Sequence, residues 1–226
     1  MRKLLNQQYE HSKRVECLLD TIADRNTSVE AYRSSFYSIG KELGNIYKDT
    51  HPLLLNTSTL LACASEDADW LASGFLNGID KPTLPIAVFW GERERLSNGI
   101  DITSIVRTYR DELKSPCENL IIIKSIISSS CVVKTQLMKL ISDIVPKSIF
   151  IIAPVMYKDA QHNLCMEFPP EIASKFTFIT FAVDAEINDR KEIIPGVGGM
   201  VYPRLGLGLE SEKNSYIPEI VKERMS

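Results

Sequence analysis

The sequence lacks the features of membrane and secreted proteins. No apolar run approaches the roughly 18 residues that a membrane span needs. The amino terminus, Met-Arg-Lys-Leu-Leu-Asn-Gln-Gln, has neither the apolar core nor the cleavage site of a signal peptide. Internal repeats and low-complexity linkers are absent as well. Of the 226 residues, 44% are hydrophobic and 24% are charged, which is typical of a soluble globular protein.

Paired cysteines and clustered histidines are lacking too. The five cysteines are widely scattered without a Cys-x-x-Cys pair, and the three histidines are equally dispersed. This pattern argues against a disulfide framework or a structural zinc site and indicates a reducing, cytoplasmic compartment. A net charge of −3 gives no bulk attraction to nucleic acid or to an anionic membrane. We therefore expect no metal site and no nucleic-acid or membrane partner.

Helical signals dominate the amino-terminal third. Thr27, followed by Glu30 three residues later, predicts a capping box that begins a helix. One apolar helical face then follows from the spacing of Val29, Tyr32, Phe36, Ile39, Leu43 and Ile46. Residues 53–78 are also expected to be helical.

From residue 85 the pattern changes to strands. Continuous β-branched and apolar runs predict strands at 85–90, 120–123, 148–155 and 176–183. A helix is predicted between the second and third strands, because one helical face there is apolar: Val132, Val133, Leu137, Leu140, Ile141 and Ile144. The fold class is therefore α/β, with a central, mostly parallel sheet flanked by helices. We expect one domain over residues 1–226, with a helical part at 1–50 and the sheet core and ligand loops at 85–208.

The loop after the second predicted strand is a candidate phosphate site. It begins at Lys124 and continues through Ser128, Ser129, Ser130, Cys131 and Val132 into the predicted helix. Unpaired backbone N–H groups and the helix dipole favour an anion at such a position. A plain turn with a helix cap explains the same residues equally well. Lys124 itself is either a ligand-facing cation or a solvated residue at a strand end.

A glycine-rich segment near the carboxyl terminus is the second candidate. It comprises Asp184, Ile194, Pro195, Gly196, Gly198 and Gly199. Its glycines permit a tight backbone path whose N–H and C=O groups can read the edge of a flat heterocycle. Taken alone, a simple glycine-rich connection explains the segment better.

Together these segments resemble the uracil phosphoribosyltransferase family through most of the chain. The Asp-Arg-Asn-Thr-Ser run at 24–28 is similar to that family's amino-terminal signature, and 184–198 to its uracil loop. The resemblance implies a glycosyltransferase fold, pyrimidine salvage from uracil and phosphoribosyl pyrophosphate (PRPP), a homodimer, and Mg²⁺ only where PRPP is bound. It also implies that residues 128–132 serve the 5′-phosphate and residues 184–199 serve uracil.

The sequence departs from the family pattern at the positions that serve the ribose, the phosphate and uracil in that family. Lys124 stands where the family has the aspartate that contacts the ribose, and Ser130 and Cys131 replace two glycines. In the uracil loop, Glu192 replaces a tyrosine and Gly199 an aspartate. A unit charge at about 4 Å is worth roughly 4 kcal/mol at a dielectric near 20, so a reversal of its sign changes the stabilisation of a developing cationic ribose by about twice that. No catalytic residue is therefore assigned.

Three functions remain open from the sequence. The first is a non-catalytic protein that binds a nucleotide or phosphate, or acts as a regulatory or partner subunit. The second is a divergent but active uracil phosphoribosyltransferase that makes UMP, and the third is a nucleotide or phosphate sensor. Cys131 at the start of the helix is either a reactive thiol beside Lys124 or a small packing residue.

Overall fold

The computed structural model describes residues 1–5, 8–95, 101–129, 131–189, 192–209 and 212–225. Seven strands lie side by side in its central sheet. Its spatial order is β1-β8-β7-β5-β2-β3-β4, and the short strand β6 pairs with β7 beside it. The bounds are β1 Arg2–Leu4, β2 Thr59–Ala64, β3 Ile86–Arg95, β4 Asp101–Arg110, β5 Asn119–Ile123, β6 Ile126–Ile127, β7 Ser148–Tyr157 and β8 Phe176–Asp184. Strands β8, β7, β5, β2 and β3 run parallel, while β1 and β4 are antiparallel edges.

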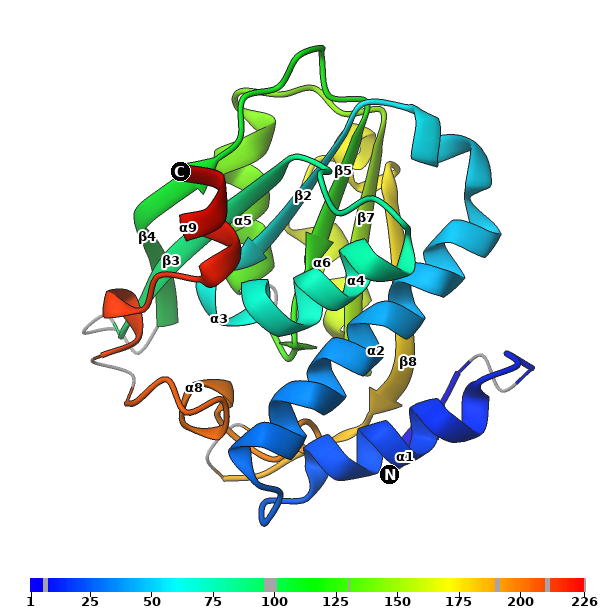
Figure 1. Ribbon diagram of the computed structural model, residues 1–226, viewed down its shortest axis with the longest axis vertical. Helices are drawn as coiled ribbons and strands as arrows, with labels where there is room; N and C mark the ends of the chain where they lie inside the picture. The colour runs from blue at the N-terminus through cyan, green and yellow to red at the C-terminus, as the bar shows by residue number, and fades with distance from the viewer. Residues whose placement is uncertain (6–7, 96–100, 130, 190–191, 210–211, 226) are drawn as a thin grey trace.

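Helices cover both faces of this sheet (Figure 1). Helices α2 (Val29–Thr50) and α4 (Ser73–Gly78) lie in front of it, and α5 (Cys131–Ile141) and α6 (Ala160–Met166) lie behind it. The other α-helices in the described part of the chain are α1 Ser12–Ala23, α3 Ser65–Asp67, α7 Pro170–Ala173, α8 Val201–Arg204 and α9 Glu219–Met225. The predicted α/β class with a mostly parallel, doubly covered sheet is thus confirmed.

The alternation of side chains along β5 shows how both faces are filled. Ile121 and Ile123 belong to the apolar cluster under α2 and α4, whereas Leu120 and Ile122 belong to the cluster under α5. All of them are fully buried. Burial on both faces explains why this strand reads as an unbroken apolar run.

The prediction of helix throughout 53–78 is wrong. Residues Thr59–Ala64 form β2, the central strand between β5 and β3. Its Leu-Leu-Ala-Cys-Ala run has the intrinsic preference of a helix, but every residue is buried against neighbouring strands, and this tertiary context overrides the weak local propensity. The rest of the segment does contain helical turns, among them a π-helical turn over Ala68–Ala72.

The start of α2 also differs from the prediction by one residue. Ser28, not Thr27, caps the helix by accepting a hydrogen bond of 3.2 Å from the Ala31 amide. The Thr27 hydroxyl instead donates to the Thr21 carbonyl oxygen at 2.6 Å. The predicted helix and most of its apolar face are present, with Tyr32, Phe36, Ile39, Leu43 and Ile46 buried and Val29 half-buried.

Four glycines bring α2 and α4 into direct backbone contact. Gly40 and Gly44 face Gly74 and Gly78, and a Cβ atom on Gly40 would lie 2.1 Å from the Leu71 carbonyl oxygen. A Cβ atom on Gly74 would lie 2.0 Å from the Tyr37 carbonyl oxygen. Only glycine permits so close an approach of two backbones.

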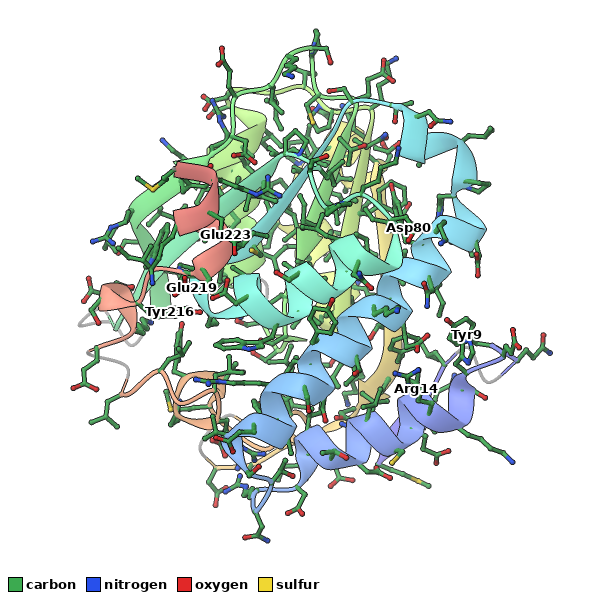
Figure 2. The ribbon with its side chains drawn as sticks, in the orientation of Figure 1. Tyr9, Arg14, Asp80, Tyr216, Glu219 and Glu223 are labelled. Atoms are coloured by element: carbon green, nitrogen blue, oxygen red, sulfur yellow. The ribbon has the colours of Figure 1, made fainter. Side chains whose placement is uncertain are left out.

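The carboxyl-terminal segment docks on this helical layer through Asp69. The Asp69 carboxylate accepts hydrogen bonds from the Glu219 and Ile220 amides at 2.9 and 3.0 Å and from the Tyr216 hydroxyl. Trp90 in β3 donates its indole N–H to the Tyr216 carbonyl oxygen at 2.6 Å. Figure 2 shows Tyr216 and Glu219 along this segment, beside the β3–β4 edge. Residues distant in sequence therefore lie next to the carboxyl ends of the strands.

No helix in the described part of the chain is long and apolar enough to cross a membrane.

The glycine contact between α2 and α4 makes a prediction for stability. Gly40→Ala forces the two backbones apart, and we expect it to lower the free energy of unfolding by about 1–3 kcal/mol, as overpacking does. Ser34→Ala, at an exposed position of the same helix, is the control and should change it by less than about 0.5 kcal/mol. Urea unfolding of both variants measures the difference, and equal stability of the two would contradict this packing.

Candidate functional site

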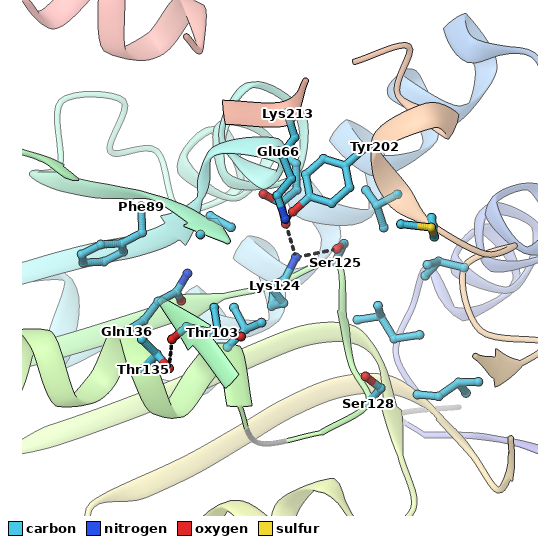
Figure 3. Close-up of a pocket in the computed structure, with 18 of the residues that line it drawn as sticks. Glu66, Phe89, Thr103, Lys124, Ser125, Ser128, Thr135, Gln136, Tyr202 and Lys213 are labelled. Atoms are coloured by element: carbon cyan, nitrogen blue, oxygen red, sulfur yellow. Dashed lines mark hydrogen bonds and ion pairs between the residues drawn. The ribbon is translucent and has the colours of Figure 1, made fainter. Parts of the chain in front are cut away.

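A cavity of about 160 Å³ opens at the carboxyl edge of the parallel strands (Figure 3). Its walls come from the end of β2 and from α3, from the middle of β3, from β4, from the loop after β5, from the first turns of α5, from residues 192–202 and from Lys213. Both segments singled out in the sequence therefore contribute to one cavity. Ligands of parallel α/β sheets bind at this edge.

Lys124 lies in this wall but does not present a free cation. Its Nζ donates to Glu66 Oε1 at 2.9 Å and to Asp67 Oδ2 at 2.7 Å. The residue is only 7% exposed, so the interpretation of Lys124 as a solvated strand-end residue is wrong. We call Lys124, Glu66 and Asp67 the buried charge cluster.

Strand register brings the buried charge cluster together. Cys63 in β2 pairs with Ile123 in β5, so the residues that follow these two strands emerge side by side. Glu66 and Asp67 lie in α3, directly after β2, and Lys124 follows β5. The Ser125 amide adds a hydrogen bond of 3.1 Å to Asp67 Oδ1. Two neighbouring strand ends thus supply the carboxylates and the ammonium group.

The electrostatics of the cluster favour a charged Lys124. Burial alone would lower its pKa, but the adjacent Asp67 and Glu66 carboxylates outweigh burial and raise that pKa above the ordinary lysine value. Burial would raise the pKa of Glu66, but Lys124 outweighs it and lowers that pKa. At Asp67 burial prevails, and its pKa rises to about 6 despite the nearby ammonium group.

The cluster extends to the carboxyl-terminal segment through Tyr202. Its hydroxyl donates to Glu66 Oε1 at 3.1 Å, and the Lys213 ammonium group lies 4.9 Å from the centre of its ring. Tyr202 and Lys213 both line the cavity, and Lys213 is 4% exposed. Figure 3 shows them beside Glu66 on one side of the cavity.

Only some of the predicted phosphate-loop residues line the cavity. Ser128 and Val132 line it, while Ser129 is exposed and Cys131 is half-buried at the start of α5. Ser130 lies outside the described residues. The position of the loop is compatible with a phosphate site, and its role stays a prediction.

The predicted uracil-loop residues divide into two groups. Gly199 lines the cavity, with Ile193 and Val197 from the same segment. Ile194, Pro195, Gly196, Gly198 and Asp184 are not among the lining residues. Gly196, Gly198 and Gly199 have φ angles of 57°, 76° and 106°, so this path does require glycine.

Asp184 fixes the glycine-rich segment to the rest of the fold. It is fully buried, binds Arg2 through two hydrogen bonds of 2.9 Å, and accepts the Gly196 amide at 2.9 Å. Arg2 also donates to the Gly196 carbonyl oxygen at 2.6 Å. Asp184 is therefore placed to hold the loop and not to contact a ligand in the cavity.

Glu192, which stands where the resembled family has a tyrosine, has polar partners. Its carboxylate accepts from Arg25 and from the Asn188 side chain, both at 2.9 Å. Glu192 also lines the cavity. It therefore supplies a paired carboxylate where the resembled family has an aromatic ring.

Sequence reasoning missed five residues of the site: Glu66, Asp67, Gln136, Tyr202 and Lys213. The acidic pair directly follows the apolar run 60–64, and this would have signalled a strand-end site had that run been recognised as a strand. Gln136 interrupts the apolar face of α5. No local signal in the sequence marks Tyr202 or Lys213.

Removing the ammonium group tests the buried charge cluster. Lys124→Met leaves two buried carboxylates without their cation, and we expect a loss of about 3–5 kcal/mol in the free energy of unfolding near pH 8. Because those carboxyls then have raised pKa values in the folded state, their protonation restores stability as the pH falls, and the loss should shrink towards pH 5. Urea unfolding at both pH values measures this.

Two matched variants complete the test. Lys147→Met removes a lysine from a surface pair with Glu118 and should cost at most about 1 kcal/mol. The triple variant Lys124→Met, Glu66→Gln, Asp67→Asn removes all three charges and should recover much of the loss. A pH-independent cost for Lys124→Met, no larger than that of Lys147→Met, would contradict the cluster.

Comparisons with known proteins inform the fold. No family model and no curated protein matches the sequence. Among solved structures, the AQ2163 protein from Aquifex aeolicus aligns with a TM-score of 0.67 and 15% identity, covering 85% of this chain and 93% of that one. Adenine phosphoribosyl transferase from Trypanosoma brucei, in complex with AMP, pyrophosphate and ribose-5-phosphate, aligns with a TM-score of 0.50 and 9% identity, covering 80% and 82%. The chain therefore has a phosphoribosyltransferase-like fold.

Proposed function

We propose that this protein binds a nucleotide in the cavity at the carboxyl edge of its sheet and does not transfer phosphoribose. The observation that carries the proposal is the buried charge cluster. Transfer at the anomeric carbon of a ribose builds positive charge, which a free carboxylate at the strand end would stabilise. Here both carboxylates at that edge already accept hydrogen bonds from the Lys124 ammonium group, so neither is free.

The charge balance of the cavity supports the same conclusion. Its described lining includes the carboxylates of Glu66 and Glu192 and the ammonium groups of Lys124 and Lys213, so the formal charges cancel. No arginine is among these residues. PRPP carries several negative charges on its diphosphate and monophosphate, and it finds no excess of positive charge in this wall.

The donor set also fits magnesium poorly. Mg²⁺ bound with a diphosphate normally takes one or two free carboxylates. Glu66 and Asp67 already accept the Lys124 ammonium group, and Glu192 is paired with Arg25. We therefore assign no step to a magnesium–PRPP complex.

A nucleotide monophosphate suits the remaining features. Ser128 and Ser129 stand before α5, and a helix amino terminus favours a phosphate. The other walls are largely apolar, with Phe89, Ile126, Val132 and Val197 among them, and can take the base. Uridine nucleotides are the class that the glycine-rich segment suggests through its resemblance to the uracil loop.

The second candidate is an active uracil phosphoribosyltransferase. One observation favours it: the left-handed glycines at 196, 198 and 199 and the bond from the Gly196 amide to Asp184 hold a defined loop beside the cavity. A loop kept in such a conformation suits recognition of a base by backbone groups. This candidate requires PRPP to bind although the carboxylates at the strand ends are already paired with Lys124.

Ligand-induced stabilisation separates the two functions. For the binding protein, UMP at about 100 times its dissociation constant should raise the melting temperature by about 5–10 °C, while PRPP with Mg²⁺ should leave it unchanged. Uridine, which lacks the phosphate, is the matched control and should act more weakly. Differential scanning fluorimetry gives the shifts.

A turnover assay decides between the binding protein and the transferase. Incubation with labelled uracil, PRPP and Mg²⁺ should yield no UMP above a protein-free blank. Rapid UMP formation would overturn the proposal in favour of the transferase. If UMP does not change the melting temperature, the proposal that the protein binds a nucleotide is wrong.

A further inference from the structure

One residue of the carboxyl-terminal segment closes part of the cavity. Among the described residues that line it, Lys213 is the only one beyond position 202. Lys213 is buried, which is rare for a lysine, and its ammonium group lies 4.9 Å from the centre of the Tyr202 ring. Tyr202 in turn donates its hydroxyl to Glu66, and Figure 3 shows the three side chains together. This side of the cavity is therefore complete only while the segment that carries Lys213 is in place.

We call residues 212–225 the carboxyl-terminal strap. Its central attachment to the rest of the protein is Asp69, which belongs to the π-helical turn after α3. The Asp69 carboxylate accepts the Glu219 and Ile220 amides at 2.9 and 3.0 Å, and it also accepts the Tyr216 hydroxyl. One carboxylate thus holds three donors of the strap.

Two further attachments fix the strap. The Tyr216 carbonyl oxygen accepts the Trp90 indole N–H at 2.6 Å. Near the end of the strap, Arg224 pairs with Asp111 and donates to the Leu84 carbonyl oxygen at 3.0 Å. The strap is therefore held to the rest of the protein by hydrogen bonds and an ion pair.

Little apolar surface of the strap is buried. Within residues 212–225, all of which the structure describes, only Lys213, Pro218 and Val221 are buried. Every residue of β5, by contrast, is buried. A segment with few buried apolar contacts opens at a lower free energy than the fold as a whole. We therefore expect the strap to open while the sheet stays folded.

We infer that the carboxyl-terminal strap is a lid, which closes the cavity through Lys213 and Tyr202 when it docks on Asp69 and exposes the cavity to water when it opens. A ligand in the cavity contacts a wall that only the docked strap completes, so ligand binding and docking stabilise each other. This coupling is reciprocal, because both effects come from one coupling free energy. Asp69 is not among the described lining residues, so its effect on a ligand passes through the strap. The inference rests on the proposed binding of a nucleotide and deepens it, since it names the segment that regulates the site.

Amide hydrogen exchange, followed by NMR, measures the docking of the strap. In the ligand-free protein, the Glu219 and Ile220 amides should have protection factors at least about tenfold lower than the Ile122 amide of β5, because the strap opens without global unfolding. Saturating UMP should raise the protection factors of Glu219 and Ile220 by at least about fivefold, the lower end of typical coupling between sites.

A variant in the cavity wall tests the lid without any ligand. Tyr202→Ala removes the ring against which Lys213 lies, and it should lower the protection factors of Glu219 and Ile220 about tenfold, the size of a desolvated cation–π contact. Tyr157→Ala is the matched control, because it removes a ring that lies 5.9 Å from the Lys158 ammonium group elsewhere in the fold. It should leave both protection factors unchanged.

A double variant outside the cavity tests the coupling to a ligand. Asp69→Asn with Arg224→Ala removes two attachments of the strap, and the Glu219 and Ile220 amides should lose their protection while Ile122 keeps its own. UMP binding, measured by calorimetry, should weaken by the same factor by which UMP protects these amides in the wild type.

The control for the double variant is Asp80→Asn with Lys222→Ala. These changes remove two exposed ion pairs, Lys48–Asp80 and Lys222–Glu219, and they leave the attachments of the strap in place. Neither the protection factors nor the affinity for UMP should change appreciably.

Two results in the ligand-free protein would overturn the inference: strap amides as well protected as Ile122, and unchanged protection of the strap in Tyr202→Ala. If UMP binds the wild type and the double variant equally, the inference also fails and the proposed function stands. If UMP does not bind while Tyr202→Ala loosens the strap, the proposed function fails and the closure of the cavity by the strap stands.

Discussion

The contact of the Lys124 ammonium group with two buried carboxylates is the interaction on which the candidate site depends. It joins the carboxyl ends of β2 and β5, the two central strands of the sheet, and it reaches Tyr202 through Glu66. Without the ammonium group, Glu66 and Asp67 would repel each other in a buried environment. Without the carboxylates, Lys124 would be a buried cation. The two carboxylates are therefore tolerated because the ammonium group is present, and the ammonium group is tolerated because of the carboxylates.

This arrangement changes how Lys124 is interpreted, a lysine at a position where the resembled family has an aspartate. A lysine there suggests a reversal of charge, and hence attraction of an anion. The cluster instead contains two carboxylates and one ammonium group, and its hydrogen bonds are directed inward. The cavity thus gains neither a free carboxylate for a developing cation nor a free ammonium group for a phosphate. What remains is a small cavity whose described lining has balanced formal charges and largely apolar walls.

Much of the sheet is predictable from the sequence, and one missed strand accounts for much of what was overlooked at the site. β5 and β7 are continuous isoleucine-rich runs, which favour buried strands wherever they occur. β2 is built from leucine, alanine and cysteine, and its strand conformation comes from its place between β5 and β3. Since the acidic pair follows β2, its meeting with Lys124 is a consequence of strand order, which local patterns do not contain.

The charge state of Lys124 tests the account most directly. NMR of the side-chain Nζ, assigned by comparison with Lys124→Met, can follow this group during an alkaline titration. If the cluster exists as described, Lys124 keeps its ammonium signal at pH values where exposed lysines, with an ordinary pKa of about 10.4, have lost half of theirs. A Lys124 that titrates together with the exposed lysines would contradict the central claim.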